Sequence, residues 1–208
     1  MNTVYVYVLD TLADWELGHV TSELNSGRFF KKDAEPISLR YVGYSKKPIT
    51  TMGGLTIIPD HVVDDIVLDE KSTLLLPGAN TWNDPNHRAM IEKARKLLAV
   101  GATVCAICGA TTALANAGLL DNRPHTSNGP GFLELFAPEY RGQSLYIDCL
   151  SFADENLITA GSTGALLWAK QIIARMDVFE PEALDAWYRY FSTGDRQAFF
   201  QLMQVTGQ

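Results

Sequence analysis

Cysteine and basic residues are scarce in this 208-residue chain. Its three cysteines are an odd number and match neither a disulfide framework nor the ligand spacing of a zinc site, so we interpret them as individual thiols. Lys and Arg total 17 against 24 Asp and Glu, which gives a net charge of −7. Because nucleic acids and anionic membranes are bound through basic faces, we expect neither as a partner.

Long apolar segments, internal repeats and low-complexity regions are also absent from the sequence. No apolar run approaches the roughly 20 residues that span a bilayer, and no basic segment followed by an apolar stretch opens the chain, so we expect a cytoplasmic protein. No motif indicates a cofactor or a metal, since the lone Gly129-Pro130-Gly131 is too weak a signal for a nucleotide site. With 47% hydrophobic residues the chain can bury a full core, and residues 1–208 are expected to form a single domain.

What the sequence does contain is an alternation of apolar strands and amphipathic helices. Residues 3–9 and 72–76 are apolar runs typical of strands buried on both faces of a parallel sheet, whereas 37–43 alternates and is expected to be more exposed. Helical periodicity is found over 12–27, 86–100 and 162–173. The pattern predicts an α/β fold with a doubly wound, mostly parallel, flavodoxin-like sheet flanked by helices.

Antiparallel hairpins and two C-terminal helices complete the predicted fold. The first hairpin joins 49–52 to 55–58 through Gly53-Gly54, because paired glycines supply the positive φ values of a two-residue turn. The second hairpin pairs 144–150 with 156–160. The two helices are expected over 181–191 and from 195 to about 205. Most of their aromatic side chains should cover the sheet, and any left outside would suit a homodimer interface.

The stretch from 103 to 118 changes from a β-branched apolar run to an alanine-rich helical pattern, with Cys108 and Gly109 at the junction. It predicts a strand, a sharp turn and a helix, which places the Cys108 thiol at the C-terminal end of a strand and at a helix N-terminus. Such a helix end lowers the pKa of a thiol, and its N–H groups can stabilise an oxyanion. We expect the backbone N–H groups of Gly109 and Ala79 to be those donors, which makes Cys108 a candidate nucleophile.

A simpler interpretation of Cys108 is a small core residue, because free cysteines frequently occupy cores. For Cys105, inside the strand, and Cys149, in the second hairpin, burial is the expected role.

Several segments together resemble the ThiJ/PfpI family, within the class I glutamine amidotransferase-like superfamily. They are the cysteine turn and helix at 106–121, the Leu-Leu-Pro-Gly-Ala run at 75–79, the late hairpin at 154–159 and Asp14-Trp15-Glu16 near the start. The resemblance covers residues 3 to 175. It implies that Cys108 is the nucleophile and that Glu16 is a protonated acid that donates a hydrogen bond to the sulfur. Without the resemblance, a solvated first-turn residue would be the simpler account of Glu16.

The sequence departs from the family pattern at Asn128, which stands where many members carry a histidine. An amide can form hydrogen bonds but cannot act as a general base near neutral pH. His125, three residues earlier in an extended segment, should point to the opposite side, so we expect a structural or exposed histidine there. The protease-like branch has a histidine directly after the cysteine, where this chain has Gly109, and glutaminases carry a downstream His-x-Glu pair that is missing here. Neither protease nor glutaminase activity is therefore expected.

The residues leave two hypotheses open. In the first, the protein is an enzyme that acts on a small molecule: Cys108 attacks a carbonyl, Ala79 and Gly109 hold the oxyanion, and Glu16, in the role that the resemblance implies, handles protons. The family activities of this type that the resemblance implies are hydrolysis of amides and processing of reactive dicarbonyls such as methylglyoxal. In the second, it is a non-enzymatic redox-sensing or stress-response protein that acts through oxidation of Cys108, which requires no general base. Because dimers are common in the family, the resemblance also implies a homodimer.

Overall fold

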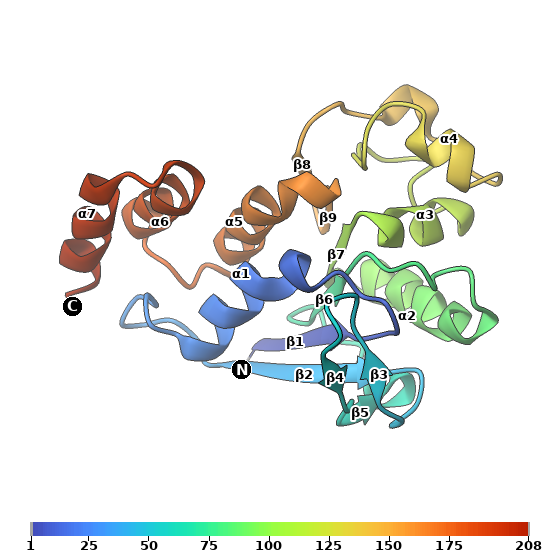
Figure 1. Ribbon diagram of the computed structural model, residues 1–208, viewed down its shortest axis with the longest axis horizontal. Coiled ribbons are helices and arrows are strands. Elements are labelled where there is room, and N and C mark those ends of the chain that lie inside the picture. Colours follow the sequence, from blue (N-terminus) through green and yellow to red (C-terminus); the bar gives the residue numbers. More distant parts are fainter. Residues whose placement is uncertain (1, 208) are drawn as a thin grey trace.

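The computed structural model describes residues 2–207 and contains a seven-stranded sheet with helices on both faces (Figure 1). The strand order is β5-β2-β1-β6-β7-β9-β8, and neighbours run parallel except for the antiparallel pair β8 and β9. The bounds of these strands are β1 Asn2–Tyr7, β2 Ile37–Gly43, β5 His61–Val62, β6 Thr73–Leu76, β7 Thr103–Ile107, β8 Ser151–Asp154 and β9 Leu157–Ala160. The predicted mostly parallel, flavodoxin-like α/β fold is confirmed.

Helices α1 (Asp14–Ser26) and α5 (Ala165–Met176) cover one face of the sheet, and α2 (Arg88–Ala99) and α3 (Gly109–Asn116) cover the other (Figure 1). The short helix α4 (Phe132–Phe136) lies beyond α3, near the edge of the sheet at which β7 ends. None of the helices within residues 2–207 combines the length and the apolar character that a membrane crossing requires.

Helix α1 forms where the apolar spacing predicts it, with Leu17, Val20 and Leu24 buried on one stripe. It ends at Gly27, whose φ of 61° lies in the left-handed region that glycine adopts without steric cost. Glu23 on the same helix is buried, and its Oε1 accepts a hydrogen bond of 2.9 Å from the indole Nε1 of Trp187. This bond ties α1 to the C-terminal part of the chain.

The C-terminal helices are α6 (Pro181–Thr193) and α7 (Arg196–Thr206), as the sequence predicts to within a few residues. Helix α6 packs against α5, and α7 packs mainly against α6 (Figure 1). Trp187 is fully buried, whereas Phe200 on α7 is 64% exposed. The aromatic side chains therefore divide between the core and the surface.

The predicted hairpins exist, but their strands and turns differ from the prediction. In the first, β3 (Ile49–Thr50) pairs with β4 (Thr56–Ile57), and the intervening loop of residues 51–55 is longer than a two-residue turn. The reason is that Gly53 donates its N–H to the Asp14 carboxylate, so only Gly54, with φ of 86°, adopts the left-handed conformation.

In the second hairpin, β8 begins only at Ser151, so a strand over 144–150 is wrong. Residues Gln143–Leu145 form a 3-10 turn instead. A tight turn at Glu155, with φ of 42°, sets the register that pairs Ser151 with Ala160 and leaves the earlier residues no partner in β9.

Candidate functional site

Cys108 occupies a strained turn between β7 and α3, with φ of 55° and ψ of −123°. A residue with a Cβ in such a conformation costs about 1–3 kcal/mol, which the surrounding structure must offset. The backbone N–H of Cys108 donates to Ala160 O (2.9 Å), and its carbonyl accepts from the Thr111 N–H (3.0 Å) and hydroxyl (2.6 Å). These bonds hold the thiol at the carboxyl end of the sheet.

Gly78, in the turn after β6, lies against both the Cys108 side chain and the carboxyl group of Glu16. The Gly78 N–H donates a 2.6 Å hydrogen bond to Glu16 Oε2. A Cβ at position 78 would lie 2.7 Å from the Cys108 Cβ and 2.8 and 2.9 Å from the two Glu16 carboxyl oxygens. Because no side chain fits in that space, glycine at 78 allows the acid and the thiol to come together.

Glu16 is fully buried, and burial raises the pKa of its carboxyl group to about 7, against the opposing effects of the hydrogen bonds from Gly78 and Cys108. Its Oε1 accepts no N–H or O–H donor within residues 2–207. A carboxyl group in this state exchanges its proton readily at neutral pH. Glu16 is therefore not the solvated first-turn residue that its local sequence alone would suggest.

The pKa of the Cys108 thiol is raised above its usual range, first by burial and further by the negative charge of Glu16. Hydrogen bonds from the Asn128 amide and the Gly109 N–H lower it by less. The depressed pKa expected from the helix N-terminus is therefore wrong, because desolvation is the larger effect. When Glu16 is protonated its charge is removed, so the pair behaves as one coupled acid.

Asn128 contacts the sulfur directly, with Nδ2 3.3 Å from Cys108 Sγ. Its Oδ1 accepts the N–H of Ser162 at 2.8 Å, and because an N–H requires an acceptor, this bond turns the amide N–H₂ toward the thiol. The side chain that replaces the family histidine is thus a hydrogen-bond donor to sulfur.

The four histidines lie away from the thiol. His125 is fully buried, hydrogen-bonded to the Tyr140 hydroxyl (2.7 Å) and the Arg123 carbonyl (2.8 Å), and so has a structural role. The others contact the Trp187 and Phe191 rings (His19), Asp60 (His61) and the Tyr7 hydroxyl (His87). Over residues 2–207, no group of His, Cys, Asp or Glu side chains is arranged to hold a metal ion.

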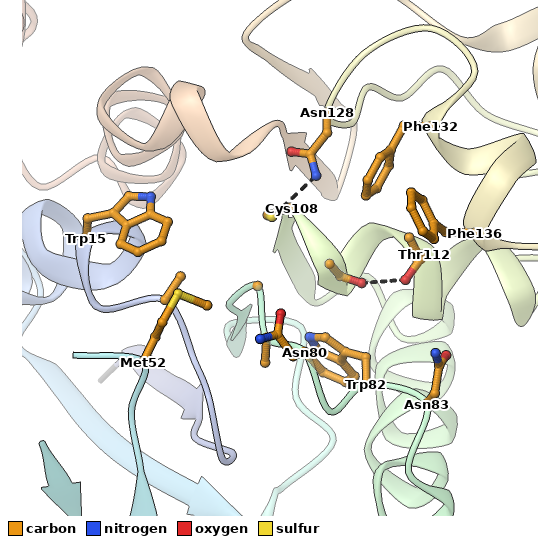
Figure 2. Close-up of a pocket in the computed structure, with 14 residues that line it drawn as sticks. Trp15, Met52, Asn80, Trp82, Asn83, Cys108, Thr112, Asn128, Phe132 and Phe136 are labelled. Atoms are coloured by element: carbon orange, nitrogen blue, oxygen red, sulfur yellow. Dashed lines mark hydrogen bonds between the residues drawn. The ribbon is translucent and has the colours of Figure 1, made fainter. Parts of the chain in front are cut away.

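Cys108, Gly109, Ala79 and Asn128 line one pocket of about 410 Å³, in which Figure 2 labels Cys108 and Asn128. Gly78 lines the same pocket, and the Glu16 carboxyl group lies against Gly78. A Cβ on Gly109 would lie 2.8 Å from the Ala79 carbonyl oxygen and 3.3 Å from its nitrogen, so the two backbones touch beside the thiol. All the candidate residues predicted from the sequence are therefore brought together.

Of the other thiols, Cys105 is fully buried in β7, as expected. Cys149, for which burial was also expected, is only half-buried and lines a second pocket, to which Asn128 also contributes.

The apolar walls of the pocket were not predicted. They consist of Trp15 on α1, Met52 on the 51–55 loop, Trp82 after β6, and Phe132 and Phe136 on α4 (Figure 2). The Phe-Leu-Glu-Leu-Phe sequence after Gly131 has aromatic residues at i and i+4, a helical spacing that could have indicated α4. No local signal indicates that Met52 approaches Trp15, because a tertiary contact brings them together.

Asp14, next to Trp15, holds the 51–55 loop against α1. Its carboxylate accepts hydrogen bonds from the Thr51 hydroxyl and the Gly53 N–H, both at 2.6 Å. The Thr51 bond is the main reason why the pKa of Asp14 is lowered. Replacement of Asp14 by Ala should release the 51–55 loop and accelerate amide hydrogen exchange there by about tenfold, the effect of losing one or two charge-assisted hydrogen bonds. Exchange mass spectrometry checks this, with exposed Asp33→Ala as control; unchanged exchange in both variants would contradict the role of Asp14.

A strained cysteine at a strand-to-helix turn of a mostly parallel sheet, with a buried carboxyl group beside the sulfur, defines a class of flavodoxin-like α/β proteins built around one thiol. Comparison with known families agrees: residues 2–175 match the DJ-1/PfpI family. The chain belongs to this family, which confirms the resemblance to ThiJ/PfpI proteins.

Relatives extend over nearly the full length of the chain. It is 42% identical over 202 residues to the Bacillus subtilis (strain 168) protein named "Uncharacterized protease YoaZ", covering 97% of this chain and 96% of the relative. The structure of a thiJ/pfpI family protein from Bacillus anthracis has 42% identity and a TM-score of 0.96, over 100% of this chain and 99% of that one. The DJ-1 superfamily protein Atu0886 from Agrobacterium tumefaciens shares the fold, with 24% identity and a TM-score of 0.80 over 94% of this chain and 100% of that one.

Proposed function

We propose that the protein is a cysteine-dependent enzyme that acts on small carbonyl compounds, as a hydrolase or a dicarbonyl-processing enzyme. The observation that carries this proposal is the position of Cys108, which lines an accessible pocket beside a buried carboxyl group whose pKa is about 7. A group with a pKa near the working pH is the most effective at moving protons. Glu16 is therefore suited to take over the general-base task that Asn128 cannot perform.

In the proposed first step the thiol sulfur attacks the substrate carbonyl carbon and its proton passes to the Glu16 carboxylate. A C–S bond forms and the carbonyl π bond becomes an oxyanion. Gly109 and Ala79 line the same pocket, and we propose that their backbone N–H groups stabilise this oxyanion. With an amide or ester, the oxyanion collapses and the leaving group departs with the proton from Glu16. Water then hydrolyses the thioester, which releases the acid and restores the thiol.

With a 2-oxoaldehyde, the same attack gives a hemithioacetal. Transfer of the C1 hydrogen to C2 as a proton, through an enediol, converts it into the thioester of a 2-hydroxy acid. Hydrolysis of that thioester by water completes an internal redox reaction that consumes no external oxidant. Both routes use the same residues of this chain.

The name of the Bacillus subtilis relative contains the word protease. We favour small substrates over peptides for this chain because Gly109 replaces the histidine that follows the cysteine in the protease-like branch. We also propose that the protein acts in the cytoplasm as a homodimer, which the exposed aromatic side chains of α6 and α7 support.

The test compares wild type, Cys108→Ala and Cys149→Ala in assays of methylglyoxal consumption and of amide and ester hydrolysis. We expect Cys108→Ala to lose at least about 100-fold in kcat/KM, as is usual for removal of a covalent nucleophile, and Cys149→Ala to retain wild-type rates. Equal turnover by wild type and Cys108→Ala, or no turnover by wild type, would reject the enzyme proposal.

A redox-sensing role is the second candidate, and the direct contact of Asn128 with the sulfur favours it, because it leaves Cys108 without a histidine base. Attack of the thiolate on hydrogen peroxide gives a sulfenic acid and hydroxide, and a second equivalent gives a sulfinic acid that protonated Glu16 could hydrogen-bond. Mass spectrometry after mild peroxide treatment tests this. Selective oxidation of Cys108 over Cys105 and Cys149 without any turnover would favour the sensor, and equal oxidation of all three would reject it.

A further inference from the structure

We infer that the pocket at Cys108 selects uncharged carbonyl compounds that carry an aromatic ring, and rejects carboxylates. This inference specifies the substrate class of the proposed enzyme and so rests on that proposal for its chemistry. Its binding part depends only on the lining of the pocket.

Among the described residues 2–207, those that line the pocket include no charged side chain. The lining is made by Ala13, Trp15, Met52, Gly78, Ala79, Asn80, Trp82, Asn83, Cys108, Gly109, Thr112, Asn128, Phe132 and Phe136. Its polar groups are amides, a hydroxyl and the thiol, which can hydrogen-bond a neutral carbonyl or amide. A carboxylate moved from water into this pocket would lose hydration without gaining a cation.

Three charged side chains that neighbour the lining either have another partner or pocket, or would repel an anion. Asp14 binds Thr51 and Gly53 at the back of the hairpin loop, and Glu16 would repel an anion whenever it is ionised. Arg88 lines a neighbouring pocket with Asp84 and Glu92, on the other side of Trp82. The acidic chain as a whole, with a net charge of −7, adds to the rejection of anions.

The walls are aromatic on opposite sides of the thiol. Trp15 faces the pocket from α1, Phe132 and Phe136 face it from α4, and Trp82 forms its floor (Figure 2). The Phe132 and Phe136 rings contact each other, with centroids 4.9 Å apart. Trp15 is 53% exposed and Phe136 is 54% exposed, so both present apolar surface that a ligand ring would cover. A single ring with a carbonyl substituent fits within a pocket of about 410 Å³.

The experiment measures binding of three unreacted ligands to Cys108→Ser at neutral pH by calorimetry: benzamide, benzoate and acetamide. Benzamide and benzoate have the same shape and differ in charge, whereas acetamide keeps the amide and lacks the ring. We expect benzamide to bind at least about tenfold more tightly than either of the others, given the cost of burying a carboxylate and the gain from aromatic contacts. Protection of the wild-type Cys108 thiol from iodoacetamide by benzamide locates the site.

Variants test whether the side chains that line the pocket determine the preference for benzamide over benzoate. Phe136→Ala should weaken benzamide binding several-fold, the matched exposed Phe200→Ala on α7 should leave it unchanged, and Met52→Arg should restore benzoate binding by supplying a cation. Benzoate or acetamide binding as tightly as benzamide, or no benzamide binding, would overturn the inference. Benzamide binding in a protein that turns over no substrate would reject the proposed enzyme alone, and turnover of aliphatic carbonyls without benzamide binding would reject the aromatic selectivity alone.

Discussion

Gly78→Ala should lower the free energy of unfolding by about 3 kcal/mol, at the upper end of the cost of inserting a methyl group into a packed site. The added Cβ would lie under 3.0 Å from the Cys108 Cβ and from both carboxyl oxygens of Glu16. None of these atoms is the end of a flexible exposed chain, because Glu16 is buried and Cys108 is held by backbone hydrogen bonds on both sides. The strain must therefore be relieved by moving α1 away from the turn after β6, which separates the acid from the thiol.

Urea denaturation of the variant measures the loss, and Gly18→Ala is the matched control. Gly18 lies in the interior of α1, exposed, with no atom within 4 Å of a Cβ built there. Because glycine is a poor helix former, Gly18→Ala should stabilise the protein by about 0.5–1 kcal/mol. If Gly78→Ala were as stable as wild type, with an unchanged rate of Cys108 alkylation, the close contact of the three residues would be disproved.

Glu16→Gln should remove about 3 kcal/mol of pH-dependent unfolding free energy, which is the free energy equivalent of a pKa raised from 4.5 to about 7. In this window the folded protein binds a proton at Glu16 that the unfolded chain does not bind. Wild-type stability from this group is therefore present at low pH and is lost as pH rises from 4.5 through 7. Glutamine has nearly the same shape, can still accept the Gly78 N–H, and does not titrate.

Denaturation of both proteins at several pH values between 4.5 and 8 checks the expected trend. The difference in unfolding free energy should shift in favour of Glu16→Gln as pH increases, and exposed Glu70→Gln should show no such trend. A constant difference across the window would show that Glu16 is not buried with a raised pKa. The same variant should alkylate Cys108 faster than wild type at pH 8, because the negative charge that raises the thiol pKa is gone.

Local sequence patterns were sufficient to predict the strands and helices next to the Cys108 thiol. The apolar runs of β6 and β7 and the switch to helical periodicity at Cys108 lie within windows of a few residues, and so does the apolar stripe of α1. The change of periodicity at Cys108 and Gly109 also predicted the sharp turn, which the φ of 55° at Cys108 confirms. The family resemblance then assigned Glu16, which its own local sequence would have placed in solvent.

Contacts between residues far apart in the sequence, or a turn within the hairpin, determined the two hairpin segments that differ from the prediction. The 51–55 loop is long because Asp14 holds Gly53, and β8 starts at Ser151 because the turn at Glu155 sets its register with β9. The local sequence favoured a two-residue turn at Gly53-Gly54 and a strand over 144–150 instead. Short polar and apolar stretches of this kind carry little information about their partners.

By itself, the sequence determined the α/β class and the strand-to-helix turn that presents Cys108, because both depend on residue types over short spans. The replacement of a histidine by Asn128 was recognised through the family resemblance. Only the tertiary structure decided the direction of the thiol pKa, the proximity of Glu16 through Gly78, and the uncharged aromatic pocket. The physical reason is that desolvation and close packing depend on what surrounds a group in three dimensions. The surroundings of Cys108 come from α1, the turn after β6, the 51–55 loop and α4, which are far apart along the chain (Figure 2).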